Sequence, residues 1–351
     1  MRQRRKLARW LVVLVALHCI IAGAGFFAPY TPVQQDRDRP YLPPMRVHLV
    51  DAQGHFHFRP FFYPLRLREN SFDQYEENTT TLVPLQFFMR GASYRLLGVL
   101  PARLHLFGAA NDRIYLLGTD AFGRDQLSRI LYGGQVSLLA GLLGAGVTLF
   151  LGALIGMAAG FYGGWRDDLL MRAAELFLAL PWLYLLFALR AFLRLAVSPL
   201  EAFLLVVVVI GVVGWARPAR LVRGVVLSVK ERDFVRASRG FGASDPYLLR
   251  RHILPETSSV LLTQAAILVP QFVLAEMTLS FLGLGVPEPA ASWGNLLASL
   301  QQYSVLVSYW WMYLPALAII PFFLGYLGLA SALQEHSGAY KIDEKSSWNL
   351  S

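Results

Sequence analysis

The chain has 351 residues, of which 55% are hydrophobic and only 16% are charged. Soluble globular proteins carry charge on about 25% of their residues, so the apolar excess predicts a chain embedded in lipid. The net charge of +9 comes from basic residues between apolar runs, a pattern typical of membrane topology signals and not of a nucleic-acid-binding surface. We therefore expect membrane lipid, and no nucleic acid, among its partners. The single cysteine, Cys19, excludes an internal disulfide framework.

The apolar runs set the expected fold class, an all-α polytopic membrane protein. A spanning helix needs about 20 mostly apolar residues, because the hydrocarbon layer of a bilayer is about 30 Å thick. The runs that meet or approach this length predict six transmembrane helices. They lie near residues 9–28, 135–160, 171–195, 200–217, 258–282 and 309–333.

The first run follows a strongly basic start, MRQRRKLARW. Lys and Arg favour the cytoplasmic side of a membrane, so six alternating spans would place both termini in the cytoplasm of a multi-pass inner-membrane protein. The basic start and the small residues AGAG at 22–25 are also typical of a cleaved signal peptide. We favour an uncleaved helix because the apolar run continues to Ala28.

Residues 29–117 form a polar, aromatic and proline-rich stretch that is too long for a turn. Strand-like segments such as MRVHLVD and HFHFRPFFY predict a small, mostly β extracytoplasmic insertion between the first two spans. Four histidines in this stretch suggest a metal site. The absence of a Cys partner and of a tight ligand set favours aromatic packing and no metal. The histidines are His48, His55, His57 and His105.

Three charged residues in or near later spans are candidates for the translocation path. Arg190 and Arg194 lie four apart, on one face of the predicted third helix. Either their long stems reach the membrane interface or they line a polar path for an anionic part of a substrate. Glu276 is the best candidate for a buried acidic group within a span.

An arginine-rich segment, FVRASRGFGASDPYLLRRHILPETSS, separates the fourth and fifth spans at residues 234–259. Residues 228–241 are compatible with a helix that Gly242 ends, and Asp245 with Pro246 is typical of the start of another. We expect Pro255 to end that second helix. An interfacial helix on anionic lipid would explain the arginines, but the ordered glycine and prolines favour a defined shape that fits a partner.

This segment resembles the cytoplasmic signature loop of ABC importer permeases, E-A-A-x-x-x-G-x9-I-x-L-P. Arg236, Ala237 and Ser238 stand at the first three positions, with Arg236 replacing the glutamate, and Gly242 stands at the glycine. His252 stands at the isoleucine, before the closing Leu254 and Pro255. Residues 116–141 and 276–297 resemble segments of dipeptide/oligopeptide/nickel permeases.

The resemblance implies a type I ABC importer fold. Residues 1–28 would hold the basic start and first helix, 29–117 the insertion, 118–335 the permease core with its coupling loop at 218–257, and 336–351 a cytoplasmic tail. It also implies a second homologous permease, two ATP-binding subunits and an extracytoplasmic solute-binding protein as partners. The coupling residues would be Arg236, Ala237, Gly242, Ala243, Ser244, Asp245, Pro246, Leu248, Leu249, Arg250, Arg251, Leu254 and Pro255.

By the same resemblance, Leu248, Leu249 and Ile253 would supply apolar contact to an ATPase, and Arg250 and Arg251 would meet acidic groups on it. The chain has no G-x-x-x-x-G-K-[ST] loop, so it would bind no cofactor while its partner subunits use ATP. It would be a permease and not an enzyme. The first expectation for the transported solute is a peptide, and the next are nickel complexes or other small organic solutes. The alternative is an ion-coupled secondary transporter, which normally places carboxylates deep within its spans.

Overall fold

The structure is a computed structural model. It describes residues 2–68, 74–96, 99–179, 181–192 and 198–348, except for the side chains of residues 2, 3, 182, 189, 190, 192 and 336–348. The chain divides into two compact units, which are described separately below. The first comprises residues 1–15, 138–279 and 321–351, and the second comprises residues 16–137 and 280–320.

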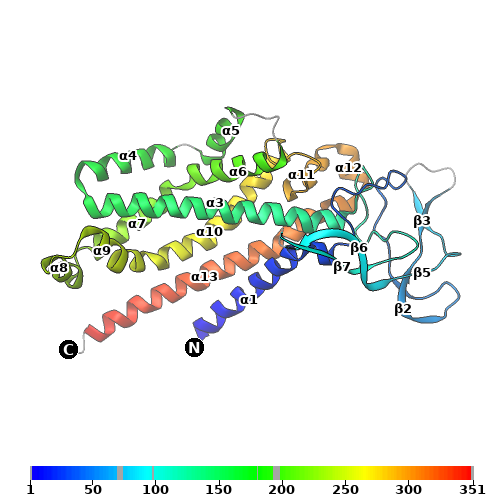
Figure 1. Cartoon of the computed structure of the whole chain (residues 1–351), viewed down its shortest axis with the longest axis horizontal. Coiled ribbons are helices and arrows are strands. Elements are labelled where there is room, and N and C mark those ends of the chain that lie inside the picture. The colour runs from blue at the N-terminus through cyan, green and yellow to red at the C-terminus, as the bar shows by residue number, and fades with distance from the viewer. Residues whose placement is uncertain (1, 69–73, 97–98, 180, 193–197, 349–351) are drawn as a thin grey trace. The chain divides into compact units, whose positions relative to one another are not determined.

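Long apolar helices dominate the chain (Figure 1). Four of them contribute residues to both units: α1 (Arg2–Ala22), α3 (Gln126–Tyr162), α10 (Leu254–Phe281) and α13 (Leu314–Trp348). Those within the first unit are α4 (Gly164–Ala179), α5 (Trp182–Phe192), α6 (Pro199–Gly214), α7 (Ala216–Val229), α8 (Asp233–Gly240), α9 (Asp245–Leu248) and a π-helical turn at Leu249–Ile253.

Among the described residues, three helical stretches are long and apolar enough to cross a membrane. They are Gln126–Tyr162, Asp245–Phe281 and Trp310–Glu335, and they contain most of the predicted second, fifth and sixth spans. The pair α6 and α7 meets the same standard if it counts as one span bent by 43°. The chain is therefore a helical membrane protein, while the count of six spans stays a prediction.

A stripe of glycines on α3 lets α7 approach closely within the first unit. A Cβ atom added at Gly152 would lie 2.7 Å from the Cβ of Pro218, and one at Gly160 would lie 2.8 Å from the Cβ of Val226. Gly156, between them, faces the backbone of Ala219 with no room for a side chain. Small residues spaced four apart are typical of tightly packed membrane helices, where dispersion contacts replace the hydrophobic effect.

The second unit contains all of the described strands, which pair antiparallel. One sheet has the order β1-β2-β5, and β3–β4 and β6–β7 form two separate pairs. Short helices α2 (Ala24–Phe27), α11 (Trp293–Ala298) and α12 (Tyr303–Ser308) also belong to this unit. The strands are β1 (His48–Val50), β2 (Phe56–Phe62), β3 (Leu65–Leu67), β4 (Tyr75–Glu77), β5 (Val83–Pro84), β6 (Gln86–Leu96) and β7 (Leu100–Gly108).

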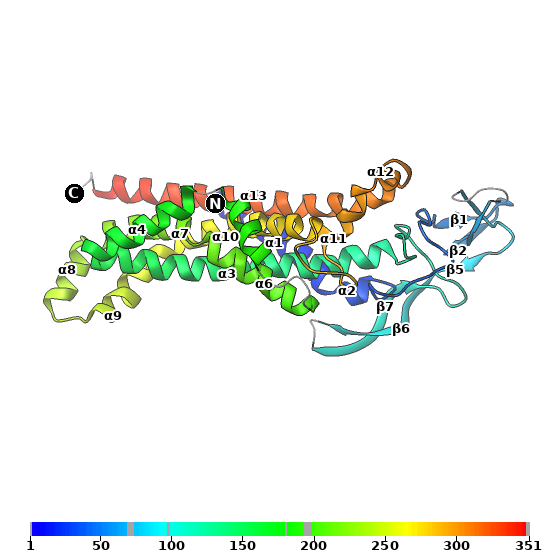
Figure 2. The same cartoon turned by 90° about the horizontal axis from the view of Figure 1, so that it is seen from above.

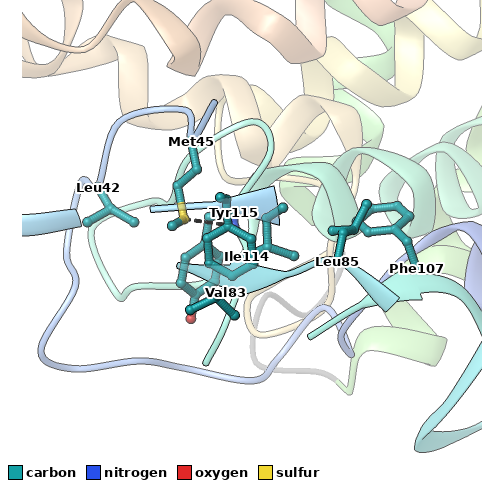
Figure 3. Close-up of a cluster of buried hydrophobic side chains, with 8 residues drawn as sticks. Leu42, Met45, Val83, Leu85, Phe107, Ile114 and Tyr115 are labelled. Atoms are coloured by element: carbon teal, nitrogen blue, oxygen red, sulfur yellow. Dashed lines mark hydrogen bonds between the residues drawn. The ribbon is translucent and has the colours of Figure 1, made fainter. Parts of the chain in front are cut away.

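The strands and the following loop enclose a small apolar core (Figure 3). Leu42 and Ile114 are fully buried in it, and the backbone N–H of Tyr115 lies 3.2 Å from the sulfur of Met45. The core shows that residues 42–115 bury apolar side chains among themselves. The division of the chain at residues 28, 117 and 335 stays a prediction.

Candidate functional site

The signature-like segment folds as two short helices joined by a tight turn, between α7 and α10 in the first unit (Figure 1). We call residues 233–253 the α8–α9 segment. The predicted continuous helix over 228–241 is interrupted, because α7 ends at Val229 and Arg232 is extended at a ψ of 145°. The break lets α8 turn so that Val235 becomes buried. Asp233 then lies in the first turn of α8, where the helix dipole favours a negative charge.

Gly242 ends α8 in a left-handed conformation, with a φ of +84°. The N–H of Ala243 donates to the carbonyl of Ser238 at 3.1 Å, and the N–H of Gly242 donates to that of Arg239 at 3.0 Å. These two bonds make a Schellman motif, which satisfies the last carbonyls of the helix and favours glycine at its left-handed position. The predicted role of Gly242 as the end of this helix is confirmed.

The second helix begins as the sequence predicts but does not end as predicted. Ser244 is the extended residue before α9, and Asp245 and Pro246 occupy its first turn. Pro255 does not end the helix, because the π turn at Leu249–Ile253 leads directly into α10, which begins at Leu254. Proline lacks a backbone donor, and a wider turn before it accommodates the lost hydrogen bond without stopping the helix.

A shared apolar core fixes the α8–α9 segment to the rest of the first unit. Leu248 and Ile253 are fully buried beside Val235, Val226 and Phe161. The expected contact of Leu248 and Ile253 with a partner is therefore wrong for this structure, because their side chains already pack within the chain. Leu249 is half-buried at the edge of the same cluster.

The segment instead exposes two aromatic side chains that the motif comparison did not single out, together with two arginines that it did. Phe241, in the turn between the helices, is 92% exposed, and Tyr247 on α9 is 52% exposed. Arg250 and Arg251 are exposed on the π turn, and neither forms an ion pair with any described residue. An aromatic side chain flanked by glycine in RGFGAS was the available signal for Phe241.

The remaining predicted residues of the segment lie at its surface or edge. Arg236 pairs with Glu231 at 3.2 Å, but both side chains are more than half exposed, so the pair contributes at most about 1 kcal/mol. His252 lies 3.2 Å from the hydroxyl of Ser238 and contacts the rings of Phe234 and Tyr247. Ala243 is half-buried, and Ala237, Ser244, Asp245, Pro246, Leu254 and Pro255 are exposed.

Two polar contacts connect the end of α7 to the neighbouring helices. Arg223 donates to both carboxylate oxygens of Asp167 in α4, at 2.5 and 2.6 Å. Lys230 donates to the backbone carbonyl of Gly160 in α3 at 2.9 Å. A bidentate arginine-carboxylate pair fixes orientation as well as distance, so α3, α4 and α7 hold the root of the segment.

The family of proteins to which the chain belongs follows from sequence comparison. Residues 152–336, more than half of the chain and including the α8–α9 segment, match the family of the binding-protein-dependent transport system inner membrane component. The chain belongs to this family. The resemblance to binding-protein-dependent permeases is thereby confirmed, and the chain is a permease component of such a transport system.

Individual relatives of this permease include proteins named for peptide transport. It is 42% identical over 205 residues to a peptide transport system permease protein of Brucella suis biovar 1 (strain 1330), covering 58% of this chain and 67% of the relative. It is 35% identical over 219 residues to the dipeptide transport system permease protein DppC of Bacillus subtilis (strain 168), covering 62% and 66%. A solved inward-facing MetNI methionine ABC transporter is 16% identical, with a TM-score of 0.45 over 59% of this chain and 95% of that one.

Of the three residues predicted to line the translocation path, the structure describes the side chain of Glu276 alone. Glu276 is fully buried in α10. The side chain of Arg190, and Arg194 altogether, lie outside the described residues. A cavity of about 330 Å³ lies in the first unit between α4, α5, α6, α7 and α10, with Arg217 and Gln271 among its mostly apolar lining residues. Glu276 does not line it.

A buried charge cluster in the second unit links the start of α3 to the loop after α10. Arg129, only 1% exposed, lies 2.8 Å from Glu288, and Arg124 lies 2.6 Å from the other oxygen of the same carboxylate. Asp120 pairs with Arg124 at 2.7 Å. Two arginines and two carboxylates thus balance each other's charge, which buried ions require.

Asp125 lies beside this cluster, at the residue before α3. Its carboxylate accepts from the backbone N–H and the hydroxyl of Ser128, at 2.8 and 2.5 Å, and so caps the helix. Complete burial raises the pKa of Asp125 to about 7, with a smaller contribution from the charge of Asp120, while the hydrogen bonds from Ser128 oppose the rise.

The histidines of the second unit make structural contacts. His57 lies 2.9 Å from Asp51 and His48 lies 3.2 Å from Glu77. The hydrogen bond from His57 is the main reason that the pKa of Asp51 falls to about 2. Across the described part of the chain, no three His, Cys, Asp or Glu side chains are arranged to hold a metal ion.

Proposed function

We propose that this permease is one of two homologous membrane subunits of an ATP-driven importer of peptides or similar small solutes. Its family membership and the names of its relatives support this proposal. The two permeases would form the translocation path between them in the inner membrane. A solute-binding protein outside would deliver the substrate, and two ATP-binding subunits inside would supply the energy. The six predicted spans would place both termini in the cytoplasm and the 29–117 insertion outside.

The observation that carries the coupling role is the exposed surface of the α8–α9 segment. Phe241 and Tyr247 are aromatic and exposed, whereas the aliphatic residues Val235, Leu248 and Ile253 of the segment are already buried. Aromatic and arginine side chains are the types that contribute most binding energy in protein interfaces. Phe241 and Tyr247 would therefore enter an apolar cleft of an ATP-binding subunit, while Arg250 and Arg251 meet acidic groups at its rim.

The mechanism follows from how the segment is held. When two ATP-binding subunits close around ATP, they would move the two bound segments toward each other. The core around Leu248 and Ile253 transmits that displacement to α7, because close-packed side chains do not yield independently. Arg223 and Asp167 carry it further to α4. The permease would thereby change between inward-open and outward-open states, with ATP bound by the partners and none by this chain.

The cavity in the first unit is the proposed contribution of this chain to the solute path. Its apolar wall, which includes Leu186 and Phe272, suits apolar side chains of a solute, and Arg217 offers a charge for a carboxylate. It lies where the predicted third and fifth spans meet. A peptide carries both an apolar side chain and a terminal carboxylate, so the lining fits that class of solute.

Reconstitution of the complete importer in proteoliposomes tests this function. The double variant Phe241→Ala/Tyr247→Ala should lose most of the ATP-binding subunits on affinity purification and most ATP-driven uptake of a labelled dipeptide. Phe58→Ala is the matched control, because Phe58 is 96% exposed in the predicted outer insertion and should leave ATPase recovery unchanged. Normal ATPase recovery and uptake in the double variant would refute the coupling role. Uptake that needs an ion gradient and no ATP would instead establish the secondary transporter.

A further inference from the structure

The hairpin of β6 and β7 has no role in the proposed transport cycle. Its strands pair from Gln86 with Gly108 at one end to Leu96 with Leu100 at the other. Within Gln86–Leu96 it contains a bulge, between Arg90 and Tyr94. The hairpin is therefore a long two-stranded element whose surface is covered by no third strand among the described residues.

Apolar side chains are exposed along this hairpin. Single exposed apolar residues are common on proteins, but a group of them on one element marks a contact surface. Two are aromatic and lie near the start of β6, and the others lie along β7 or just before it. The group consists of Phe87, Phe88, Val99, Leu100 and Leu104.

The charges on the hairpin are all of one sign. Arg90, Arg95 and Arg103 are exposed, and residues 86–108 contain no Asp or Glu. None of the three arginine side chains forms an ion pair with the described part of the chain, although other arginines of the second unit, such as Arg39 and Arg124, do. The hairpin thus presents positive charge and apolar surface together.

The hairpin is attached to the end of the predicted first span. It lies beside α2, the short helix that follows α1 (Figure 2). The ring of Tyr94 packs on Gly25 so closely that no Cβ would fit there. The buried ring of His105 lies between two backbone carbonyls, with Nδ1 2.6 Å from the oxygen of Ala28 and Nε2 2.9 Å from that of Ala92. Ala28 is the last residue of the span predicted over 9–28.

We propose that the β6–β7 hairpin binds the outer surface of the membrane, with its apolar side chains in the interface and its arginines on anionic lipid phosphates. Apolar and aromatic side chains partition into the membrane interface, and basic side chains are attracted to anionic lipid headgroups. Attachment at Ala28 brings the hairpin to the level at which the chain leaves the lipid. The inference rests on the outward orientation of the insertion in the proposed function. The hairpin would fix the insertion against the bilayer.

Quenching of a fluorophore on the full chain in nanodiscs tests this binding. In a Cys19→Ser background, Leu100→Cys would carry an environment-sensitive dye. Phe58→Cys would be the control, because Phe58 is also an exposed apolar residue of the second unit but lies outside the hairpin. With phosphatidylglycerol in the nanodisc, doxyl-labelled lipid should quench the dye at position 100 and aqueous iodide should not. The dye at position 58 should show the opposite.

Charge removal tests the anionic part of the proposal. Each basic residue near an anionic surface contributes about a fivefold preference, so Arg95→Gln/Arg103→Gln should lower the ratio of immersed to free hairpin about 25-fold. Arg37→Gln/Arg46→Gln removes the same charge from exposed positions outside the hairpin and should leave the ratio unchanged. The same ratio for both double variants would overturn the role of the hairpin arginines.

Two further outcomes would overturn lipid binding altogether. Iodide quenching at position 100 equal to that at position 58 would show that the hairpin lies in water. Protection of position 100 only after addition of the solute-binding protein would show that the hairpin binds that protein instead. Failure of the proposed function is measured separately, because ATP-driven uptake is assayed with the complete importer in proteoliposomes and does not enter the quenching ratio.

Discussion

Leu248→Ala tests whether the buried core of the α8–α9 segment is what gives the segment its fixed shape. Leu248 is fully buried beside Val226, Val235 and Ile253, so water does not reach the space that its methyl groups would leave. Truncating a fully buried leucine costs about 3 to 5 kcal/mol, because the transfer free energy and the cavity left behind add together. We expect a cost near the lower end of this range, because the segment ends in an exposed turn that can collapse around the gap.

Leu254→Ala is the matched control for this change. Leu254 lies six residues further along the same continuous helix, but its side chain is 41% exposed. Removing the same atoms there costs about 1 kcal/mol, because part of the apolar surface already contacts solvent or lipid. Both variants replace leucine by alanine, so the change in helix propensity is nearly the same. The difference between them therefore isolates burial.

Hydrogen exchange of backbone amides in residues 233–253 is the appropriate measurement, since this segment can open locally without unfolding the membrane-embedded helices. A loss of 3 kcal/mol in local stability predicts exchange about 100-fold faster in Leu248→Ala than in the unaltered chain. Leu254→Ala should accelerate exchange by less than about tenfold. Equal acceleration by both variants would refute the packing argument and the transmission of force that we derive from it.

Three other changes test the polar contacts. Glu288→Ala removes the closer of the two carboxylates that pair with the nearly inaccessible Arg129 and leaves Asp120 at 3.5 Å. It should lower the melting temperature of the purified chain by an amount equivalent to about 2 kcal/mol, less than for a fully buried pair because Glu288 is 46% exposed. Arg223→Lys replaces two hydrogen bonds to Asp167 by one and should cost about 1 kcal/mol in the same assay, with no loss as the contradicting result. The raised pKa of Asp125 predicts that stability falls as pH rises from about 4 to about 7, because Asp125 ionises at a lower pH in the unfolded chain than in the folded one. Asp125→Asn should flatten the dependence of melting temperature on pH, and an unchanged slope would contradict the assignment.

The features that the sequence predicted are those encoded by neighbouring residues. Gly242 ends α8 because only glycine adopts a positive φ there without strain, and Asp245 with Pro246 suits the first turn of a helix wherever it occurs. Long apolar runs likewise predict long helices, because in lipid the backbone must form its own hydrogen bonds. Local rules of this kind need no knowledge of the tertiary structure.

The features that the sequence did not predict depend on distant parts of the chain. An apolar helix face at Leu248 shows that the side chain will be covered, but not whether its own chain or a partner covers it. Pro255 continues a helix because the turn before it widens, which local propensity does not encode. Glu288 meets Arg124 and Arg129 across more than 150 residues of sequence, and no spacing rule connects them.

The rigidity that the proposed coupling requires comes from backbone proximity as much as from the core of the α8–α9 segment. Where α3 presents Gly152, Gly156 and Gly160, α7 approaches so closely that side chains on α3 would have no space. Lys230 then bonds to the carbonyl of Gly160 at the point where α7 ends. Sliding of α7 along α3 would break these contacts together, so the two helices resist relative movement more than an interface of long, flexible side chains would. A partner that pulls on Phe241 would therefore displace α3 with α7, and replacing Gly156 by a larger residue would weaken coupling without touching any exposed residue of the segment.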